Sequence, residues 1–170
     1  LSGGNIYSRI YSAGNINSSG LYLADGLWHY VVFTHGSAIG GQKLYADGVE
    51  VASNSKASSD FTWQDRLWLG YSADNGRYLS GYMDEVRVWN RAFTGSEVLA
   101  NMTNTLSGSE SNLIGYWRFN EGAGTESLDR TTNARNAVLL NDPLWVPEGS
   151  YALAGYNLFA QYLLDLELAD

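Results

Sequence analysis

Aromatic and polar residues around one loop are the side chains of this sequence best suited to bind a ligand. Trp63 and Tyr78 flank a loop that holds Asp74 and Asn75. Aromatic rings offer large faces on which the apolar faces of sugars stack, and loop residues often carry binding. These four residues predict a glycan-binding site, with Asp74 and Asn75 as its polar partners. Tyr71 also flanks this loop. The alternative is that the rings only cover a sheet edge.

A second polar loop, residues 120–136, holds candidate ligands for a metal ion. Calcium takes about six to eight oxygen ligands, often from flexible loops. Glu121, Asp129 and Asn133 therefore predict a structural calcium site. The alternative is ordinary turn chemistry, in which Asn and Asp side chains bond their own backbone. Zinc is not expected, because the only two histidines have no third ligand near them in the sequence.

Paired carboxylates would indicate a glycoside hydrolase, and Asp84 and Glu85 are adjacent. Retaining hydrolysis needs two carboxyl groups about 5–5.5 Å apart. Adjacent strand residues point to opposite faces, so this pair does not suit that role. In the alternating run 82–89, Asp84 shares a face with Val86 and Val88, which predicts a buried, structural carboxylate. Other acidic residues could still converge in space: Glu121, Glu126 and Asp129.

The composition is that of a folded β protein. Hydrophobic residues make up 45% of the chain and charged residues 16%, whereas a disordered chain has the opposite bias. The 14% of aromatic residues suit pleated sheets, and the 19 glycines supply turns. A length of 170 residues suggests one domain with a substantial core.

Charge and cysteine content exclude several classes of function. The net charge of −8 disfavours nucleic acids and anionic membranes as partners. The chain has no cysteine, so disulfides and thiolate chemistry are excluded. It has no run of about 18 apolar residues, which excludes membrane insertion. A start at Leu1 suggests a processed or excised fragment, and the composition suits an extracellular or cell-surface bacterial module.

Short alternating runs, separated by turn residues, must position these candidate sites. Asp47-Gly48 separates two such runs and is a strong hairpin signal, because a type I′ turn needs positive φ at both central positions. Weak alternation predicts short strands within residues 1–23, and the clearer strands are expected at residues 28–33, 43–46, 49–52, 66–71, 82–89, 113–119, 137–140 and 143–146. Four tryptophans of these strands are expected in the core: Trp28, Trp68, Trp89 and Trp117.

One short helix is predicted near residues 94–103. Thr94 and Glu97 have the spacing of a capping box, in which each side chain accepts a hydrogen bond from the other residue's backbone. Phe93 and Val98 have the spacing of a hydrophobic staple. The helix and its cap therefore follow from local sequence alone.

The last segment, residues 148–170, differs from the rest. Leu158, Tyr162 and Leu166 have helical spacing, but Leu164, Leu166 and Leu168 alternate with acidic residues as in a strand. The pattern leaves helix and strand equally open. We therefore divide the chain into a β domain, residues 1–147, and a C-terminal tail, residues 148–170.

Several of these runs resemble laminin-G-like and pentraxin-like domains, which have the concanavalin A-like jelly roll. Residues 28–32 (WHYVV) and 44–49 (LYADGV) resemble the family's "WH … LYVDG" hairpin, and residues 81–91 (GYMDEVRVWNR) resemble its "G-x-I-D-E-V-R-I-W-N" signature. Residues 113–125 (LIGYWRFNEGAGT) resemble its "L-V-x-Y-W-x-F-x-E-G-x-G-T" segment. The likeness covers roughly residues 22–147.

The resemblance implies a two-sheet antiparallel jelly-roll sandwich. Family members are mostly extracellular modules that bind glycans or proteins, often with calcium. The related glucanases carry E-x-D-x-x-E on one strand, whereas the comparable segment here lacks the leading Glu. The family's opening strands are missing or poorly matched by residues 1–23, which predicts open sheet edges through which the chain could self-associate.

We therefore expect a non-catalytic carbohydrate-binding or adhesion module of a larger secreted or surface protein. Its partners would be glycans or surface proteins. One alternative is a structural or protein-interaction spacer, and a second is a divergent glycoside hydrolase.

Overall fold

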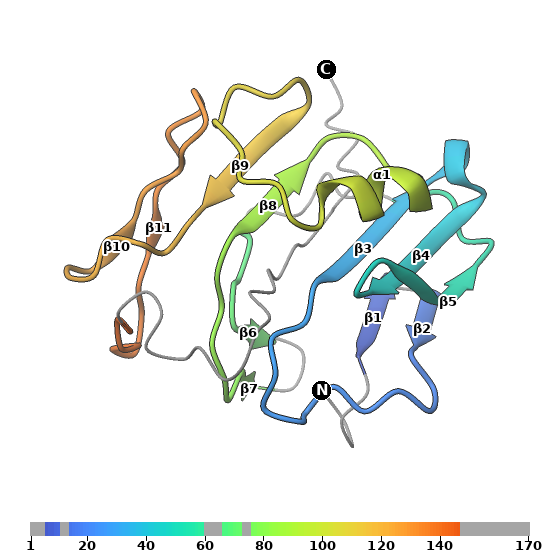
Figure 1. Cartoon of the computed structure of the whole chain (residues 1–170), viewed down its shortest axis with the longest axis horizontal. Coiled ribbons are helices and arrows are strands. Elements are labelled where there is room, and N and C mark those ends of the chain that lie inside the picture. Colours follow the sequence, from blue (N-terminus) through green and yellow to red (C-terminus); the bar gives the residue numbers. More distant parts are fainter. Residues whose placement is uncertain (1–5, 11–13, 60–65, 73–75, 147–170) are drawn as a thin grey trace.

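The computed structural model describes residues 6–10, 14–59, 66–72 and 76–146, and it is an antiparallel β-sandwich with one α-helix (Figure 1). A three-stranded sheet lies at its centre, in the order β3 (Val31–Gly36), β4 (Gly41–Ala46) and β5 (Val49–Asn54). A short 3-10 helix, Ser37–Ile39, joins β3 to β4. These strands contain the β-branched and aromatic runs that the sequence places there.

The predicted hairpin turn is confirmed. Asp47 has a φ of 52° and Gly48 a φ of 80°, as both central positions of a type I′ turn require. A β-carbon on Gly48 would lie 2.7 Å from Leu99 Cδ1, so glycine also suits the close approach of the helix to this turn.

Both faces of the central sheet are covered. Hairpin β1 (Tyr7–Ile10) and β2 (Gly14–Asn17) covers one face, where Ile10 and Ile16 pack with Phe33 and Leu44. The sequence suggested that opening strands were missing or poorly matched in residues 1–23. The weak alternation of residues 1–23 also predicts short strands, and the structure forms two of them as this hairpin, whose alternate isoleucines supply the apolar face that the sheet lacks.

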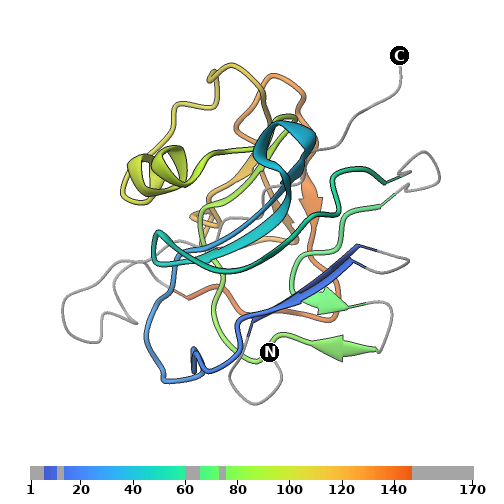
Figure 2. The ribbon, with the colours of Figure 1, turned by 90° about the vertical axis from the view of Figure 1, so that its right-hand side faces the viewer.

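The opposite face of the sheet packs on β8, β9 and the helix (Figure 2). Strand β8 (Val86–Trp89) pairs with β9 (Leu113–Trp117), and α1 (Gly95–Asn101) lies between them in the sequence. This core cluster combines apolar residues of the sheet, of β8–β9 and of the helix: Tyr30, Val32, Tyr45, Trp89, Phe93, Val98, Leu113 and Tyr116.

The predicted helix cap is confirmed. The Thr94 backbone N–H donates to Glu97 Oε2 at 2.8 Å, and the Glu97 N–H donates to Thr94 Oγ1 at 3.4 Å. Phe93 and Val98 lie in one buried cluster, as the staple spacing predicts. No helix in the described part of the chain is long and apolar enough to cross a membrane.

Two small hairpins complete the described structure. Strand β6 (Tyr71–Ser72) pairs with β7 (Arg77–Tyr78), and β10 (Glu126–Ser127) pairs with β11 (Ala137–Val138). Hairpin β6–β7 lies apart from helix α1 in both views (Figures 1 and 2). The strands expected over residues 66–71 and 137–140 are shorter than predicted, and residues 143–146 form no strand. Gly70, with a φ of 74°, interrupts the extended backbone before β6.

Candidate functional site

Three aromatic rings lie together at hairpin β6–β7. Tyr71 and Tyr78 are cross-strand partners, so their rings project from the same face of the hairpin, with centroids 4.8 Å apart. Trp68 packs edge-on against Tyr71 at 5.6 Å. Tyr78 is 64% exposed and Trp68 is 41% exposed, so this cluster faces solvent rather than the core.

A second aromatic pair follows directly along the chain. The rings of Trp28 and Tyr82 have centroids 6.2 Å apart, and Tyr82 is 59% exposed. Because Tyr82 is only four residues after Tyr78, their Cα atoms lie at most about 14 Å apart. We name these five side chains the aromatic surface: Trp28, Trp68, Tyr71, Tyr78 and Tyr82.

The hairpin that carries this surface is held by local bonds. The Leu79 backbone N–H donates to the Gly70 carbonyl at 2.7 Å, just beyond the Tyr71–Tyr78 pair. The Asn141 side-chain amide donates to the Tyr78 hydroxyl at 3.4 Å, which links the hairpin to the chain after β11. An exposed apolar cluster anchored in this way has the properties of a binding site.

The predicted glycan-binding residues are only partly described. Tyr78 lies in the aromatic surface, whereas Trp63, Asp74 and Asn75 lie outside the described residues. Trp68 was expected in the core and is exposed, so that prediction is wrong. The strand pattern of residues 66–71 placed it inside, and the turn at Gly70 removes that strand.

The other three tryptophans that were expected in the core differ in how deeply they are buried. Trp89 and Trp117 are buried in the core as predicted, but Trp28 is only half-buried against Tyr82. Trp28 precedes β3 instead of lying within it, since that strand begins at Val31. This displacement of the strand start is what leaves Trp28 at the surface.

His29 holds the loop that carries Trp28. Its Nδ1 lies 2.9 Å from Asp47 Oδ2, and its Nε2 lies 3.0 Å from Asp25 Oδ1. Burial opposes the charged ring, but the hydrogen bonds and charges of Asp47 and Asp25 outweigh it and raise the pKa of His29. His29 lies in the WH segment that resembles the family's hairpin, and these contacts give it a hydrogen-bonding role there.

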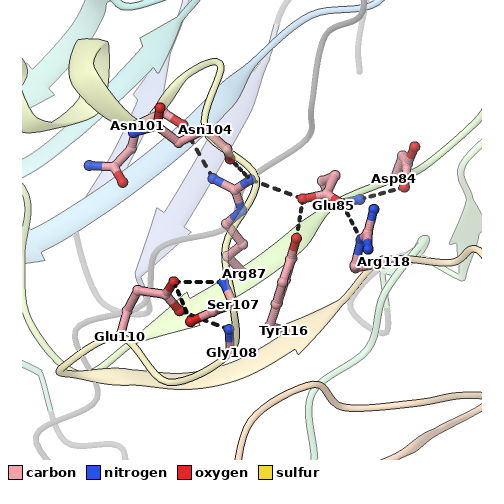
Figure 3. Close-up of polar contacts among 10 residues, drawn as sticks. All are labelled: Asp84, Glu85, Arg87, Asn101, Asn104, Ser107, Gly108, Glu110, Tyr116 and Arg118. Carbon is pink, nitrogen blue, oxygen red and sulfur yellow. Dashed lines mark hydrogen bonds and ion pairs between the residues drawn. The ribbon is translucent and has the colours of Figure 1, made fainter.

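Glu85, rather than Asp84, is the buried carboxylate of the acidic pair (Figure 3). Its side chain is 4% exposed, and it accepts hydrogen bonds from Arg87 Nη2 at 2.9 Å, Arg118 Nε at 3.0 Å and the Tyr116 hydroxyl at 2.5 Å. Arg87 is itself fully buried and also donates to the backbone carbonyls of Asn101 and Asn104. The cluster ties β8 to β9 and to the chain after the helix.

The prediction that Asp84 lies in the core is wrong. Strand β8 begins only at Val86, and Asp84 is half-buried before it, with Oδ1 accepting the Glu85 N–H at 2.8 Å. Both faces of β8 are buried, because Val86 and Val88 pack in one cluster and Trp89 in another. Sequence alternation assumes one solvent-facing side, so it could not place Glu85 and Arg87 inside.

Asp129 organises the second polar loop through hydrogen bonds from backbone groups. Its Oδ1 accepts from the Tyr116 N–H at 3.0 Å and the Thr131 N–H at 2.9 Å. Its Oδ2 accepts from Thr131 Oγ1 at 2.9 Å and the Arg135 N–H at 3.0 Å. Four donors thus occupy the acceptor positions of one carboxylate, which matches the turn chemistry that was the alternative to metal binding.

The other two proposed calcium ligands also form hydrogen bonds with protein groups. Glu121 accepts from Ser127 Oγ and from the Leu128 N–H, both at 3.1 Å. The Asn133 side-chain amide donates to the Ile114 carbonyl at 3.0 Å. Within the described residues, no three or more His, Cys, Asp or Glu side chains gather as a metal site. The three side chains are thus engaged with protein groups in this structure, and calcium binding stays a prediction.

Comparison with known proteins identifies the family. A solved structure that matches is an S-layer domain-containing protein from Clostridium thermocellum, 26% identical over 56% of this chain and 49% of that chain, with a TM-score of 0.40. This chain therefore spans about half the length of that structure. No curated protein matches. The family model for the concanavalin A-like lectin/glucanases superfamily matches residues 1–99, more than half of the sequence, and the chain belongs to that superfamily.

Proposed function

We propose that this chain is a non-catalytic carbohydrate-binding module, with the aromatic surface as its binding site. The observation that carries the proposal is the exposure of Trp68, Tyr78 and Tyr82 within one short stretch of the chain. Soluble proteins seldom expose contiguous apolar patches without a partner for them. In a superfamily of lectins and glucanases, a sugar is the partner that best suits such rings.

The chemistry of this surface suits a neutral glycan. The C–H faces of a pyranose ring pack on the exposed faces of Tyr78 and Trp68, which gives apolar contact without charge. The hydroxyl of Tyr78 and the side-chain amide of Asn141 lie next to each other and can bond sugar hydroxyl groups. The net charge of −8 opposes a polyanionic ligand.

A binding role without catalysis is supported by the state of the acidic pair. Glu85 is buried and already bonded to two arginines and a tyrosine, so it has no access to a polysaccharide. Asp84 bonds the neighbouring backbone N–H. Turnover of polysaccharides by the full chain, lost on Asp84→Ala, would overturn this part of the proposal.

The proposed setting is the cell surface or the extracellular space, where such a module would attach a larger protein to glycans. The absence of cysteine makes the chain independent of the redox state of its surroundings. Its acidic charge favours solubility outside the cell.

The test is binding of the full chain to an array of immobilised neutral polysaccharides, including β-glucans, xylans and galactans. We expect Tyr78→Ala and Trp68→Ala each to weaken binding by about tenfold, since loss of one stacked ring removes about 1–2 kcal/mol. Leu128→Ala is the matched control, because Leu128 is also exposed but follows β10, outside the aromatic surface. Binding that is unchanged in both aromatic variants would exclude this surface.

A second candidate function, a protein-interaction spacer, is favoured by a different patch. Exposed aliphatic residues lie on strand β11 and in the chain after it: Val138, Leu140 and Leu144. We expect this patch to contact a protein, such as a second copy of this chain. Sedimentation of the full chain over a range of concentrations tests this, and a monomer at every concentration, unchanged by Leu144→Asp, would argue against self-association.

A further inference from the structure

We propose that His29 is a positioning residue of the aromatic surface: its doubly protonated ring holds the Trp28 loop in place, so that glycan binding weakens as the pH rises. The expected effect on glycan binding rests on the proposed function. The positioning of Trp28 itself stands on the geometry of His29 and its two carboxylate partners.

The first step is that both ring nitrogens of His29 face an acceptor. Nδ1 lies 2.9 Å from Asp47 and Nε2 lies 3.0 Å from Asp25. A carboxylate only accepts hydrogen bonds, so both contacts are hydrogen bonds when the ring carries two N–H groups. The charged groups that face His29 are these two carboxylates, one from the loop before β3 and one from the β4–β5 turn.

The second step is that a neutral ring cannot keep both contacts. Neutral imidazole has one N–H, so its other nitrogen would direct a lone pair at a carboxylate oxygen. Deprotonation therefore breaks one of the two hydrogen bonds and replaces it with repulsion. The ring donates to both carboxylates at once only in its charged form, and we call this pair of hydrogen bonds the clamp.

The third step identifies the contact that breaks. Asp47 is fixed to the sheet, because its Oδ1 accepts the Tyr30 N–H at 2.9 Å and its own N–H donates to the Tyr30 carbonyl at 2.8 Å. Asp25 is bonded within its own loop, through the Leu27 N–H at 2.9 Å. We therefore expect neutral His29 to keep Asp47 and release Asp25.

The fourth step connects this clamp to the binding surface. Trp28 precedes His29 directly and lies between Asp25 and the start of β3, and its ring packs on Tyr82. With Asp25 held, the two ends of the segment that carries Trp28 are fixed. With Asp25 released, this segment loses the anchor at its first end, and the Trp28–Tyr82 pair loses that support.

The direction of the pH effect follows from the same contacts. Burial lowers the pKa of His29, but the two carboxylates outweigh it, so the pKa in the folded chain lies above the ordinary value of about 6.5. The clamp is therefore closed below that ordinary value and opens as the pH rises through the folded pKa. Stability gained from the clamp is lost in the same window.

The experiment follows two NMR signals of the ¹⁵N-labelled full chain between about pH 5.5 and about pH 9, the window in which a perturbed histidine titrates. One is the His29 ring and the other is the Trp28 indole N–H, assigned with Trp28→Phe. We expect both to titrate with one midpoint above the ordinary histidine value. Asp25→Asn should lower that midpoint, and the matched control Glu126→Gln on β10 should leave it unchanged.

A binding arm separates this inference from the proposed function. Using the polysaccharide selected by the array, we expect about fivefold weaker binding at the alkaline end, the lower range of typical coupling between sites. In His29→Gln, which cannot carry the second proton, binding should not change with pH. If no polysaccharide binds at any pH, the proposed function fails, while the NMR arm still decides the positioning role.

Two results would overturn the inference. A Trp28 signal that does not move with the titration of His29 would show that the clamp does not position Trp28. Binding of equal strength across the pH range, in a chain whose Trp28 does follow His29, would show that the clamp does not regulate the site.

Discussion

Glu85 shows how one buried charge organises its surroundings. Its carboxylate bonds two arginines and Tyr116, and burial together with Glu85 raises the pKa of Tyr116 to about 12, so that this hydroxyl keeps its proton and donates. Arg87, fully buried, also lies 5.5 Å over the Tyr116 ring. Such a cluster is stable only while every member keeps its partners.

We therefore expect Glu85→Ala to destabilise the fold strongly. Removal of the carboxylate leaves Arg87 buried without a counter-charge, which typically costs about 3–5 kcal/mol. Asp84→Ala is the neighbouring control and should cost only about 1 kcal/mol, because it removes a local bond to the Glu85 N–H. Urea unfolding followed by circular dichroism measures both, and equal losses in the two variants would contradict this assignment.

Asp129 allows a prediction about calcium. Since N–H and O–H donors already occupy both carboxylate oxygens, we expect the melting temperature to be unchanged by a calcium chelator or by added calcium. Asp129→Ala should lower it in either condition, because several N–H groups lose their acceptor. Stabilisation by calcium that Asp129→Ala abolishes would instead establish the site that the sequence suggested.

At the scale of elements, the sequence predicted best what depends on neighbouring residues. The capping box at Thr94 and the turn at Asp47-Gly48 require only adjacent side chains and backbone angles, and both are present. The burial of Glu85 depends on which faces other strands cover, and the exposure of Trp68 follows from the turn at Gly70 that removes its expected strand. The alternation of hydrophobic residues shows neither of these features, so the sequence could not predict the burial of Glu85 or the exposure of Trp68.

The capping box allows a quantitative test of how much contacts between neighbouring residues stabilise helix α1. Helix α1 has seven residues, too few to be stable alone, so its cap contributes a substantial part of its local stability. We expect Thr94→Ala to cost about 1 kcal/mol, and Thr94→Ser, which retains the hydroxyl acceptor, to cost much less. Chemical unfolding of the three chains gives the comparison, and a cost equal for Ala and Ser would mean that the hydroxyl group is not the source.

At the scale of the whole molecule, the sandwich depends on covering both faces of sheet β3–β4–β5. The helix side could be foreseen from the motifs of residues 81–125, whereas the cover on the other side comes from a hairpin with weak alternation and many polar residues. The candidate binding surface was foreseen at Tyr71 and Tyr78, which flank one loop in the sequence. Its other rings, Trp28, Trp68 and Tyr82, join it through contacts that the sequence does not show.

Hairpin β1–β2 is therefore predicted to be an integral part of the fold. Ile16 is 5% exposed and packs in the cluster that contains Phe33 and Leu44, so Ile16→Ala should leave a cavity and cost about 2–5 kcal/mol. Val49→Ala is the control, since Val49 is 64% exposed and should change stability by less than about 0.5 kcal/mol. Thermal unfolding of the full chain measures both, and equal melting temperatures for Ile16→Ala and the unaltered chain would mean that the sheet does not need this hairpin as its cover.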